Sequence, residues 1–270
     1  MESLYNENGH IVIAGSCALE TREQLKENVK ELKERGVRVV RASLWKPRTR
    51  PGWEGMGDDG ISVLLEETIP LGLIPATEVM TGRHALMIDK RVQAYGKEAR
   101  AVVWIGARNQ NHFEQKEIAR VLSTGSGQVY LMVKNQVWYD KKHWLGIFEH
   151  IVETGFPLDR LIMCHRGFSP GMQDNPCGYR NLPDMDMAME VRCQTCVPMI
   201  LDPSHIGGSR ENVFEVMQQS REYVFDGYMV EVHCRPDKAW TDKEQQITPD
   251  QLEEFMAYDS PDFFIASRKI

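Results

Sequence analysis

Short apolar segments rich in β-branched residues recur at fairly even intervals along the chain. Each segment is apolar at both odd and even positions, which predicts a strand that is buried on both faces. The eight segments are Ile11–Ala14, Val37–Val40, Leu73–Ala76, Val102–Ile105, Val129–Val133, Leu161–Cys164, Pro198–Leu201 and Gly227–Val230.

Stretches with helical spacing lie between most of these strands. Their apolar residues recur three, four or seven positions apart, which places them on one helix face. Thr21 and Thr248 each precede a glutamine by three residues, the spacing of a capping box, and Gly36 stands where the first helix should end. The apolar triplets are Leu25, Val29 and Leu32; Leu145, Phe148 and Val152; and Val213, Met217 and Val224.

A strand–helix unit repeated eight times predicts parallel strands joined by right-handed crossovers. A doubly wound sheet and a closed barrel both satisfy this pattern. The first strand is not followed by Gly-x-Gly-x-x-Gly, which weakens the dinucleotide-binding form of the first alternative. A barrel needs about 250 residues, and the chain has 270. We therefore predict one (β/α)8 TIM barrel over residues 1–260, with residues 261–270 as a tail or the start of a linker.

Composition narrows the range of partners. The net charge of −7 makes nucleic acid or an anionic membrane a poor partner. The chain starts without a secretory signal pattern and contains no apolar run of about 18 residues. Six cysteines in a chain of this length do not form a disulfide framework. We therefore expect a cytoplasmic protein that binds neither nucleic acid nor membranes.

Polar residues cluster directly after nearly every predicted strand. In a parallel barrel these strand ends meet on one face, where active sites form. The residues expected there are Cys17, Arg41, Lys46, Arg48, Thr49, Glu78, Arg108, Lys134, His165, Arg166, Asp202, Ser204, His205, Glu231 and His233.

Six of the residues expected on this face are cationic, although the protein is acidic overall. Like charges repel unless an anion lies between them, and arginine matches phosphate and carboxylate oxygens bidentately. We therefore expect a strongly anionic ligand that carries more than one phosphate. The six are Arg41, Lys46, Arg48, Arg108, Lys134 and Arg166.

Four further side chains are of types that bind metals, namely Cys17, His205, Glu231 and Asp242. A thiolate, an imidazole and two carboxylates suit a first-row dication such as Mn²⁺, Fe²⁺, Co²⁺ or Zn²⁺. Because these residues are scattered along the chain, their spacing does not distinguish a metal centre from unrelated polar residues.

Several stretches resemble motifs of the 3-deoxy-D-arabino-heptulosonate 7-phosphate (DAHP) synthases. Lys46–Thr49 reads KPRT, Ile105–Asn109 begins with IGAR, and Asp202–His205 reads DPSH. Glu231–His233 reads EVH, and Asp242 follows at the family's distance. These motifs span nearly the whole chain in the family's order. One departure is the serine before Cys17, where the family usually has proline.

Three other stretches resemble a type I subgroup whose members can carry a C-terminal chorismate mutase domain. They are His165–Ser169, Tyr179–Pro183 and Ala239–Asp242. The resemblance therefore implies a chorismate mutase domain as a fused or associated partner, and self-association into a dimer or tetramer.

The family resemblance implies a reaction and a role for each matching residue. The reaction joins phosphoenolpyruvate to erythrose 4-phosphate, the first step of the shikimate pathway to the aromatic amino acids. Cys17, His205, Glu231 and Asp242 would bind the divalent metal, with Cys17 and His205 also serving catalysis. Lys46 would donate a proton, and we expect neighbouring cations to lower its pKa. Phosphoenolpyruvate would be held by Arg41, Lys46, Arg108, Lys134 and Arg166, and the aldose phosphate by Arg48 and Thr49.

Two other functions compete with this one. The sister synthases that use arabinose 5-phosphate share the barrel and the chemistry, but carry KANRS where this chain carries KPRT. A catalytically silent barrel that binds a regulatory partner is the second alternative. Degenerate enzymes usually lose a ligand or a phosphate clamp, whereas all the residues named above are present.

Overall fold

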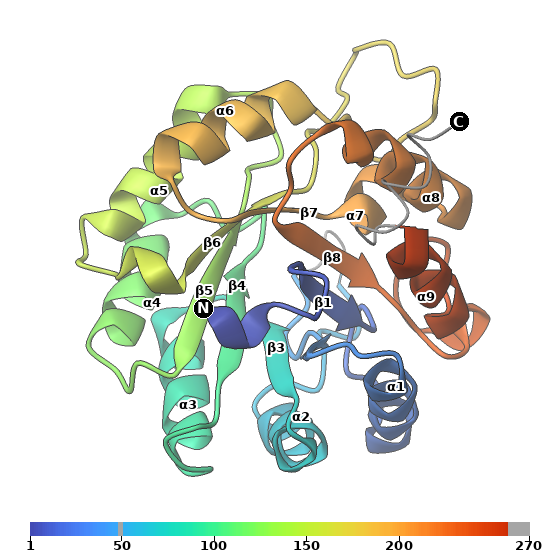
Figure 1. Cartoon of the computed structure of the whole chain (residues 1–270). Helices are drawn as coiled ribbons and strands as arrows, with labels where there is room; N and C mark the ends of the chain where they lie inside the picture. The colour runs from blue at the N-terminus through green and yellow to red at the C-terminus, as the bar shows by residue number, and fades with distance from the viewer. Residues whose placement is uncertain (48–50, 259–270) are drawn as a thin grey trace.

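The eight predicted strands form a closed parallel barrel in chain order, with β8 paired back to β1 (Figure 1). This computed structural model describes residues 1–47 and 51–258. The TIM-barrel prediction is confirmed, and the doubly wound alternative is wrong. The strands are β1 Ile11–Gly15, β2 Val39–Arg41, β3 Ile74–Glu78, β4 Ala101–Ile105, β5 Val129–Lys134, β6 Leu161–His165, β7 Met199–Leu201 and β8 Gly227–Glu231.

Helices surround the barrel, as Figure 1 shows. The α-helices are α1 Arg22–Glu34, α2 Asp59–Thr68, α3 Gly82–Gln93, α4 His112–Ser123, α5 Lys141–Val152, α6 Met185–Thr195, α7 Pro203–Gly207, α8 Arg210–Gln219 and α9 Pro249–Tyr258. Short 3₁₀ helices are η1 Glu2–Leu4, η2 Ile69–Leu71, η3 Leu158–Arg160, η4 Ser220–Glu222 and η5 Pro236–Lys238.

The predicted helix signals are mostly correct. Thr21 Oγ1 accepts the N–H of Gln24 at the start of α1. At α9 the capping box is complete, because Thr248 and Gln251 each accept the other's backbone N–H. Val224 is the exception, since α8 ends before it and its side chain is 67% exposed.

Two apolar layers hold the barrel together. Side chains two residues apart on a strand face the same side, so each strand alternates between the barrel interior and the helices. Ile13, Val102 and Met132 face the interior, whereas Val103 and Leu131 pack among the outer core residues. The N-terminal η1 covers one end of the barrel, where Leu4 is almost fully buried with the interior residues.

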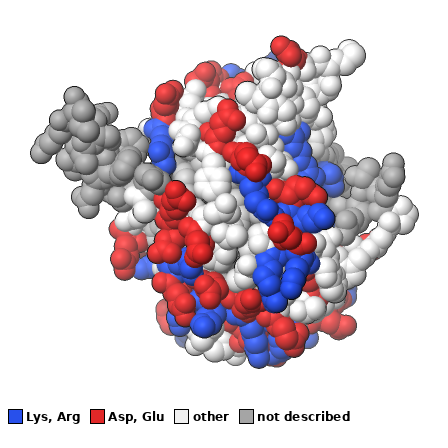
Figure 2. All heavy atoms as spheres, turned by 90° about the vertical axis from the view of Figure 1, so that its right-hand side faces the viewer, with Lys and Arg blue, Asp and Glu red and all other residues white. Residues whose placement is uncertain are grey.

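Charges of both signs are interspersed on the face turned to the viewer in Figure 2, the right-hand side of Figure 1. On this side Arg35 of α1 pairs with Glu31 of its own helix and with Asp250 and Glu253 of α9. The excess negative charge of the protein therefore does not form a single acidic patch on this face. Among the described residues, no helix has the length and apolar character needed to cross a membrane.

The seam that closes the barrel depends on a glycine. Gly227 opens β8 opposite Ile11 with φ +155°, and a Cβ there would lie 2.0 Å from the Ile11 carbonyl oxygen. Gly227→Ala should therefore displace backbone and lower the free energy of unfolding by about 3 kcal/mol or more. Denaturant unfolding followed by circular dichroism measures this.

Gly36→Ala is the matched control for Gly227→Ala. Gly36 also has a positive φ of +75°, but a Cβ there meets open space. Gly36→Ala should lower the free energy of unfolding by only about 1 kcal/mol, because an alanine is strained in the left-handed conformation. Equal losses from the two variants would show that the close approach at the β1–β8 seam is unimportant.

Candidate metal centre and anion pocket

A layer of charged side chains closes the barrel interior at the carboxyl ends of the strands. Each of these residues comes two positions after an apolar residue that faces inward, so it faces inward as well. The layer consists of Arg41 after Val39, Glu78 after Ala76, Lys134 after Met132, and Glu231 after Met229. All four are buried. Three of them, Arg41, Glu78 and Lys134, border a cavity of about 760 Å³ at this end of the barrel, which we call the mouth.

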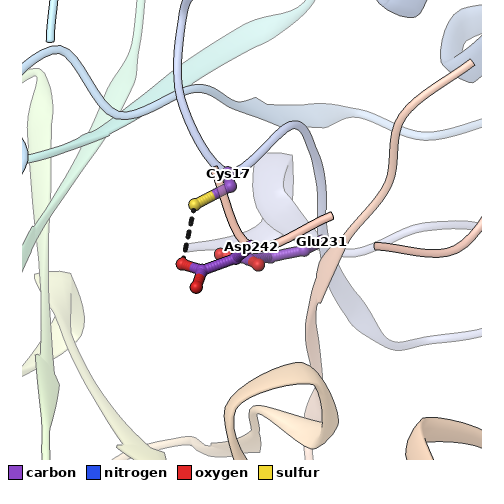
Figure 3. Close-up of side chains that lie close together, drawn as sticks. All are labelled: Cys17, Glu231 and Asp242. Atoms are coloured by element: carbon purple, nitrogen blue, oxygen red, sulfur yellow. Dashed lines mark hydrogen bonds between the residues drawn. The ribbon is translucent and has the colours of Figure 1, made fainter. Parts of the chain in front are cut away.

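Three of the four predicted metal ligands come together at the side of this mouth. One ligand atom from each of Cys17, Glu231 and Asp242 lies within 4.8 Å of the other two (Figure 3). Cys17 follows β1 and Glu231 ends β8, so the β1–β8 pairing brings them together. Asp242 comes from the long loop after β8, and the Cys17 thiol donates a hydrogen bond to Asp242 Oδ2 at 3.3 Å.

His205 stands beside this group but is not part of it. It lies in α7, and its Nε2 is 3.9 Å from Glu231 Oε1. Its Nδ1 lies 2.9 Å from Asp202 Oδ2, and Asp202 Oδ1 accepts the backbone N–H of His205. Because a carboxylate only accepts, Nδ1 carries the proton and Nε2 offers its lone pair to the side where Glu231 lies.

The ionisation of these residues fits a divalent metal. Burial opposes charge on Glu231, but the Arg41 guanidinium holds its pKa below the usual value. Lys46 and Arg180 do the same for the pKa of Asp242. Burial, opposed in part by Asp202, lowers the pKa of His205, so its imidazole is neutral at neutral pH. The donor set is therefore two carboxylates, a neutral imidazole and a thiol.

Two further details bear on metal binding. Glu231 Oε1 is buried and lies 3.1 Å from Arg41 Nη2, yet it accepts no hydrogen bond from any described residue. Burial and the nearby Glu231 raise the pKa of the Cys17 thiol to about 12. A metal binds the thiolate, so metal binding here would release a proton and weaken as the pH falls.

The prediction that cations lower the pKa of Lys46 is wrong. Lys46 Nζ donates to Cys17 Sγ at 2.9 Å. Burial lowers its pKa, but the contact with Cys17 and the carboxylates of Glu231 and Glu78 outweigh burial and raise it. Lys46 is therefore a protonated lysine at neutral pH.

The remaining predicted cations line the cavity. Arg41 and Lys134 both lie over the Trp104 ring, 5.0 and 5.8 Å from its centroid, and Lys134 pairs with Asp202 at 2.5 Å. Arg108 borders the cavity at a more exposed position. Arg48 and Thr49 lie outside the described residues.

Arg166 lies in the same wall and is held by Asn181. Its Nη1 donates to Asn181 Oδ1 at 2.6 Å. Burial lowers the pKa of Arg166 to about 10, which still leaves it cationic at neutral pH. The cavity therefore offers several fixed cations beside the cluster of Cys17, Glu231 and Asp242.

A profile of the DAHP synthetase I family matches residues 5–262. The chain belongs to this family. A phospho-2-dehydro-3-deoxyheptonate aldolase from Thermotoga maritima is 32% identical over 243 residues, which is 89% of this chain and 66% of the relative. The chain thus spans slightly less than two thirds of that relative's length.

Two solved structures from Thermotoga maritima are similar to this DAHP synthetase I chain. One is a crystal structure of a DAHP synthase, with a TM-score of 0.79, 27% sequence identity, and coverage of 93% of this chain and 68% of that one. The other is a truncated form of DAHP synthase, with a TM-score of 0.77, 26% identity, and coverage of 94% and 86%.

Three residues of the site in this family member were given no role from the sequence. Trp104 lies under two cations, Asn181 holds Arg166, and Arg180 donates to Asp242 Oδ1 at 3.2 Å. Trp104 has an inward strand position that could have indicated its place. Asn181 and Arg180 lie in a loop, where no periodicity shows which way a side chain points.

His165 was expected at the mouth but faces away from it. It follows the inward Cys164 by one residue, so it points to the helices and stacks on Trp144 with ring centroids 5.4 Å apart. Its Nε2 accepts the N–H of Asp184, the N-cap of α6. Burial lowers the pKa of His165 to about 3.

Burial of His165 should make folding sensitive to acid. Below its ordinary pKa of about 6.5 the unfolded chain takes up a proton at this residue, whereas the folded chain does not until about pH 3. Stability is therefore lost as the pH falls through this window. When the pH is lowered from 8 to 5, the free energy of unfolding should fall by about 2 kcal/mol more for the wild type than for His165→Gln.

The His165→Gln variant keeps a hydrogen-bond acceptor for the Asp184 N–H but cannot titrate. Urea unfolding of both proteins at pH 8 and pH 5 gives the comparison, and the other titrating groups cancel between them. The same loss of stability in both proteins would contradict a neutral, buried His165.

Proposed function

We propose that the chain is a metal-dependent DAHP synthase that condenses phosphoenolpyruvate with erythrose 4-phosphate, the first step toward aromatic amino acids. The observation that supports this most strongly is a metal-type cluster beside a cationic cavity. Among the described residues lining the cavity, six are Arg or Lys and two are Asp or Glu, an excess of four positive charges. Two phosphorylated substrates, one also a carboxylate, match that excess.

The reaction needs water at one carbon and a proton at another group. C3 of phosphoenolpyruvate forms the new bond to the aldehyde carbon, and water adds to C2 and gives up one proton. Phosphate then leaves from C2 as the C2 hydroxyl loses its proton to the departing phosphate or to solvent and becomes the carbonyl. The aldehyde oxygen gains a proton and becomes a hydroxyl. Lys46 is protonated at neutral pH and is our candidate for that donor.

A divalent metal held by Cys17, His205, Glu231 and Asp242 would act as a Lewis acid on the aldehyde oxygen or orient a water. The chain's cations do the remaining work of binding. Arg41, Lys134 and Arg166 are fixed by Glu231, Asp202 and Asn181, respectively. We propose that these three, with Lys46 and Arg108, hold phosphoenolpyruvate, and that Arg48 and Thr49 hold the aldose phosphate.

The test is phosphoenolpyruvate consumption with Mn²⁺, with erythrose 4-phosphate or arabinose 5-phosphate as the second substrate, and with or without excess chelator. We expect turnover only with the four-carbon sugar, and its loss with chelator. Cys17→Ala should lower kcat at least 100-fold because the site loses its thiolate ligand. Cys193→Ala, an exposed cysteine of α6, should behave as the wild type.

Each other outcome excludes one alternative. Turnover with arabinose 5-phosphate would identify the sister activity. No turnover with either sugar would favour the silent barrel. Full activity of Cys17→Ala, or activity in excess chelator, would contradict the metal assignment.

Arg166 provides a separate test of the anion pocket. Arg166→Met removes a buried cation with charge-assisted hydrogen-bonding capacity, which contributes about 1.5–3 kcal/mol. The KM for phosphoenolpyruvate should therefore rise about 10- to 100-fold, and more than the KM for erythrose 4-phosphate. Arg120→Met, on the exposed face of α4, is the matched control and should change neither constant. An unchanged KM for phosphoenolpyruvate in Arg166→Met would remove Arg166 from the pocket.

The organisation around the barrel is part of the same proposal. We propose that residues 1–260 form the catalytic unit, that residues 261–270 are a tail or the start of a linker, and that a chorismate mutase domain is a fused or associated partner. The protein would work in the cytoplasm as a dimer or tetramer. The motifs shared with the fused subgroup support the choice of chorismate mutase.

A further inference from the structure

Two consecutive glutamines, Gln245 and Gln246, lie buried behind the candidate metal ligands. They follow Asp242 in the loop after β8. Each amide of the pair both donates and accepts a hydrogen bond. Neither side chain borders the cavity, so neither is placed to contact substrate.

Gln245 connects two of the ligands through its side-chain amide. Its Nε2 donates to Glu231 Oε2 at 2.7 Å, and its Oε1 accepts from Arg180 Nη1 at 2.6 Å. Arg180 Nη1 also donates to Asp242 Oδ1 at 3.2 Å. The amide cannot be turned over, because a guanidinium only donates and an ionised carboxylate only accepts. The donors and acceptors of the chain Glu231–Gln245–Arg180–Asp242 are therefore fixed: Arg180 donates to Asp242 and to Gln245, and Gln245 donates to Glu231.

This chain determines which oxygen of Glu231 is available. Gln245 occupies Oε2, and Oε1 is left without a hydrogen bond from any described residue. Oε1 is also the oxygen that lies 3.9 Å from His205 Nε2. Glu231 Oε2 is thus held by Gln245, whereas Glu231 Oε1 faces His205.

The backbone holds the two glutamines in place. The N–H of Ile247 donates to the carbonyl of Glu231 at 3.0 Å, which pairs this segment with the end of β8. Gln246 Oε1 accepts the N–H of Cys17 at 3.0 Å, and its Nε2 donates to the Thr241 carbonyl. Gln245 therefore contacts a ligand's carboxylate, whereas Gln246 contacts a ligand's main chain.

We propose that Gln245 is a positioning residue for the metal: it orients Glu231 to bind a divalent cation through Oε1 alone and, through Arg180, restrains Asp242. This inference rests on the proposed metal-dependent function. Partners behind metal ligands commonly contribute 10- to 100-fold to metal affinity, and Gln245 together with Arg180 joins Glu231 to Asp242 by hydrogen bonds.

The test is the Kd for Mn²⁺, measured from the electron paramagnetic resonance signal of free Mn²⁺ during titration of the full chain. Gln245→Met should raise the Kd about 10- to 100-fold, while kcat at saturating Mn²⁺ falls much less. Gln128→Met is the matched control. Gln128 is a buried glutamine that donates to the Gly96 and Ala99 carbonyls, far from the mouth, and its variant should keep the wild-type Kd within about twofold.

The outcomes separate the two claims. If the wild type binds no Mn²⁺, the proposed metal-dependent function fails and this inference fails with it. If the wild type binds Mn²⁺ and Gln245→Met has the same Kd with an unchanged circular dichroism spectrum, only the positioning role is overturned. If Gln245→Met does not fold, Gln245→Asn decides, because it keeps a buried amide but is one methylene too short to reach Glu231. It should also weaken binding, and an unchanged Kd would overturn the role.

Discussion

The buried carboxylate of Glu231 is the group on which the rest of the site depends. A charge without a partner in a protein interior costs several kcal/mol, so the fold must bring partners to it. Arg41 reaches it from β2, across β1, and Gln245 donates a hydrogen bond to it from the loop after β8. Because these partners come from elements far apart in sequence, closing the barrel and assembling the metal-type cluster are one event.

A second buried ion pair joins Lys134 at the end of β5 to Asp202 after β7. Trp104 lies beneath both Arg41 and Lys134, so the two cations are fixed by an aromatic face as well as by carboxylates. Charged groups held this way lose little freedom when an anion binds. Arg41 and Lys134 therefore have two roles. They neutralise buried carboxylates, and they hold positive charge in place for a ligand with several negative charges.

Alternation along the strands made much of this structure predictable from the sequence. The strands differ from the prediction by at most two residues at either end, and Arg41 and Glu231 were expected at the mouth because they directly follow buried strands. His165 was misplaced because the prediction counted strand ends but ignored which face each residue takes. The raised pKa of Lys46 was missed because the prediction weighed only the cations and not Glu78 and Glu231, which it had placed on the same face. Gln245 was missed because it lies in a loop, where no periodicity shows which way a side chain points.

The most direct test of the central claim is anomalous diffraction from crystals grown with Mn²⁺ and phosphoenolpyruvate. We predict one strong manganese peak within bonding distance of Cys17 Sγ, His205 Nε2, Glu231 Oε1 and an Asp242 carboxylate oxygen, with phosphoenolpyruvate against Lys134 and Arg166. Phosphoenolpyruvate bound in the cavity with no manganese at these four residues, or with manganese held elsewhere, would contradict the account.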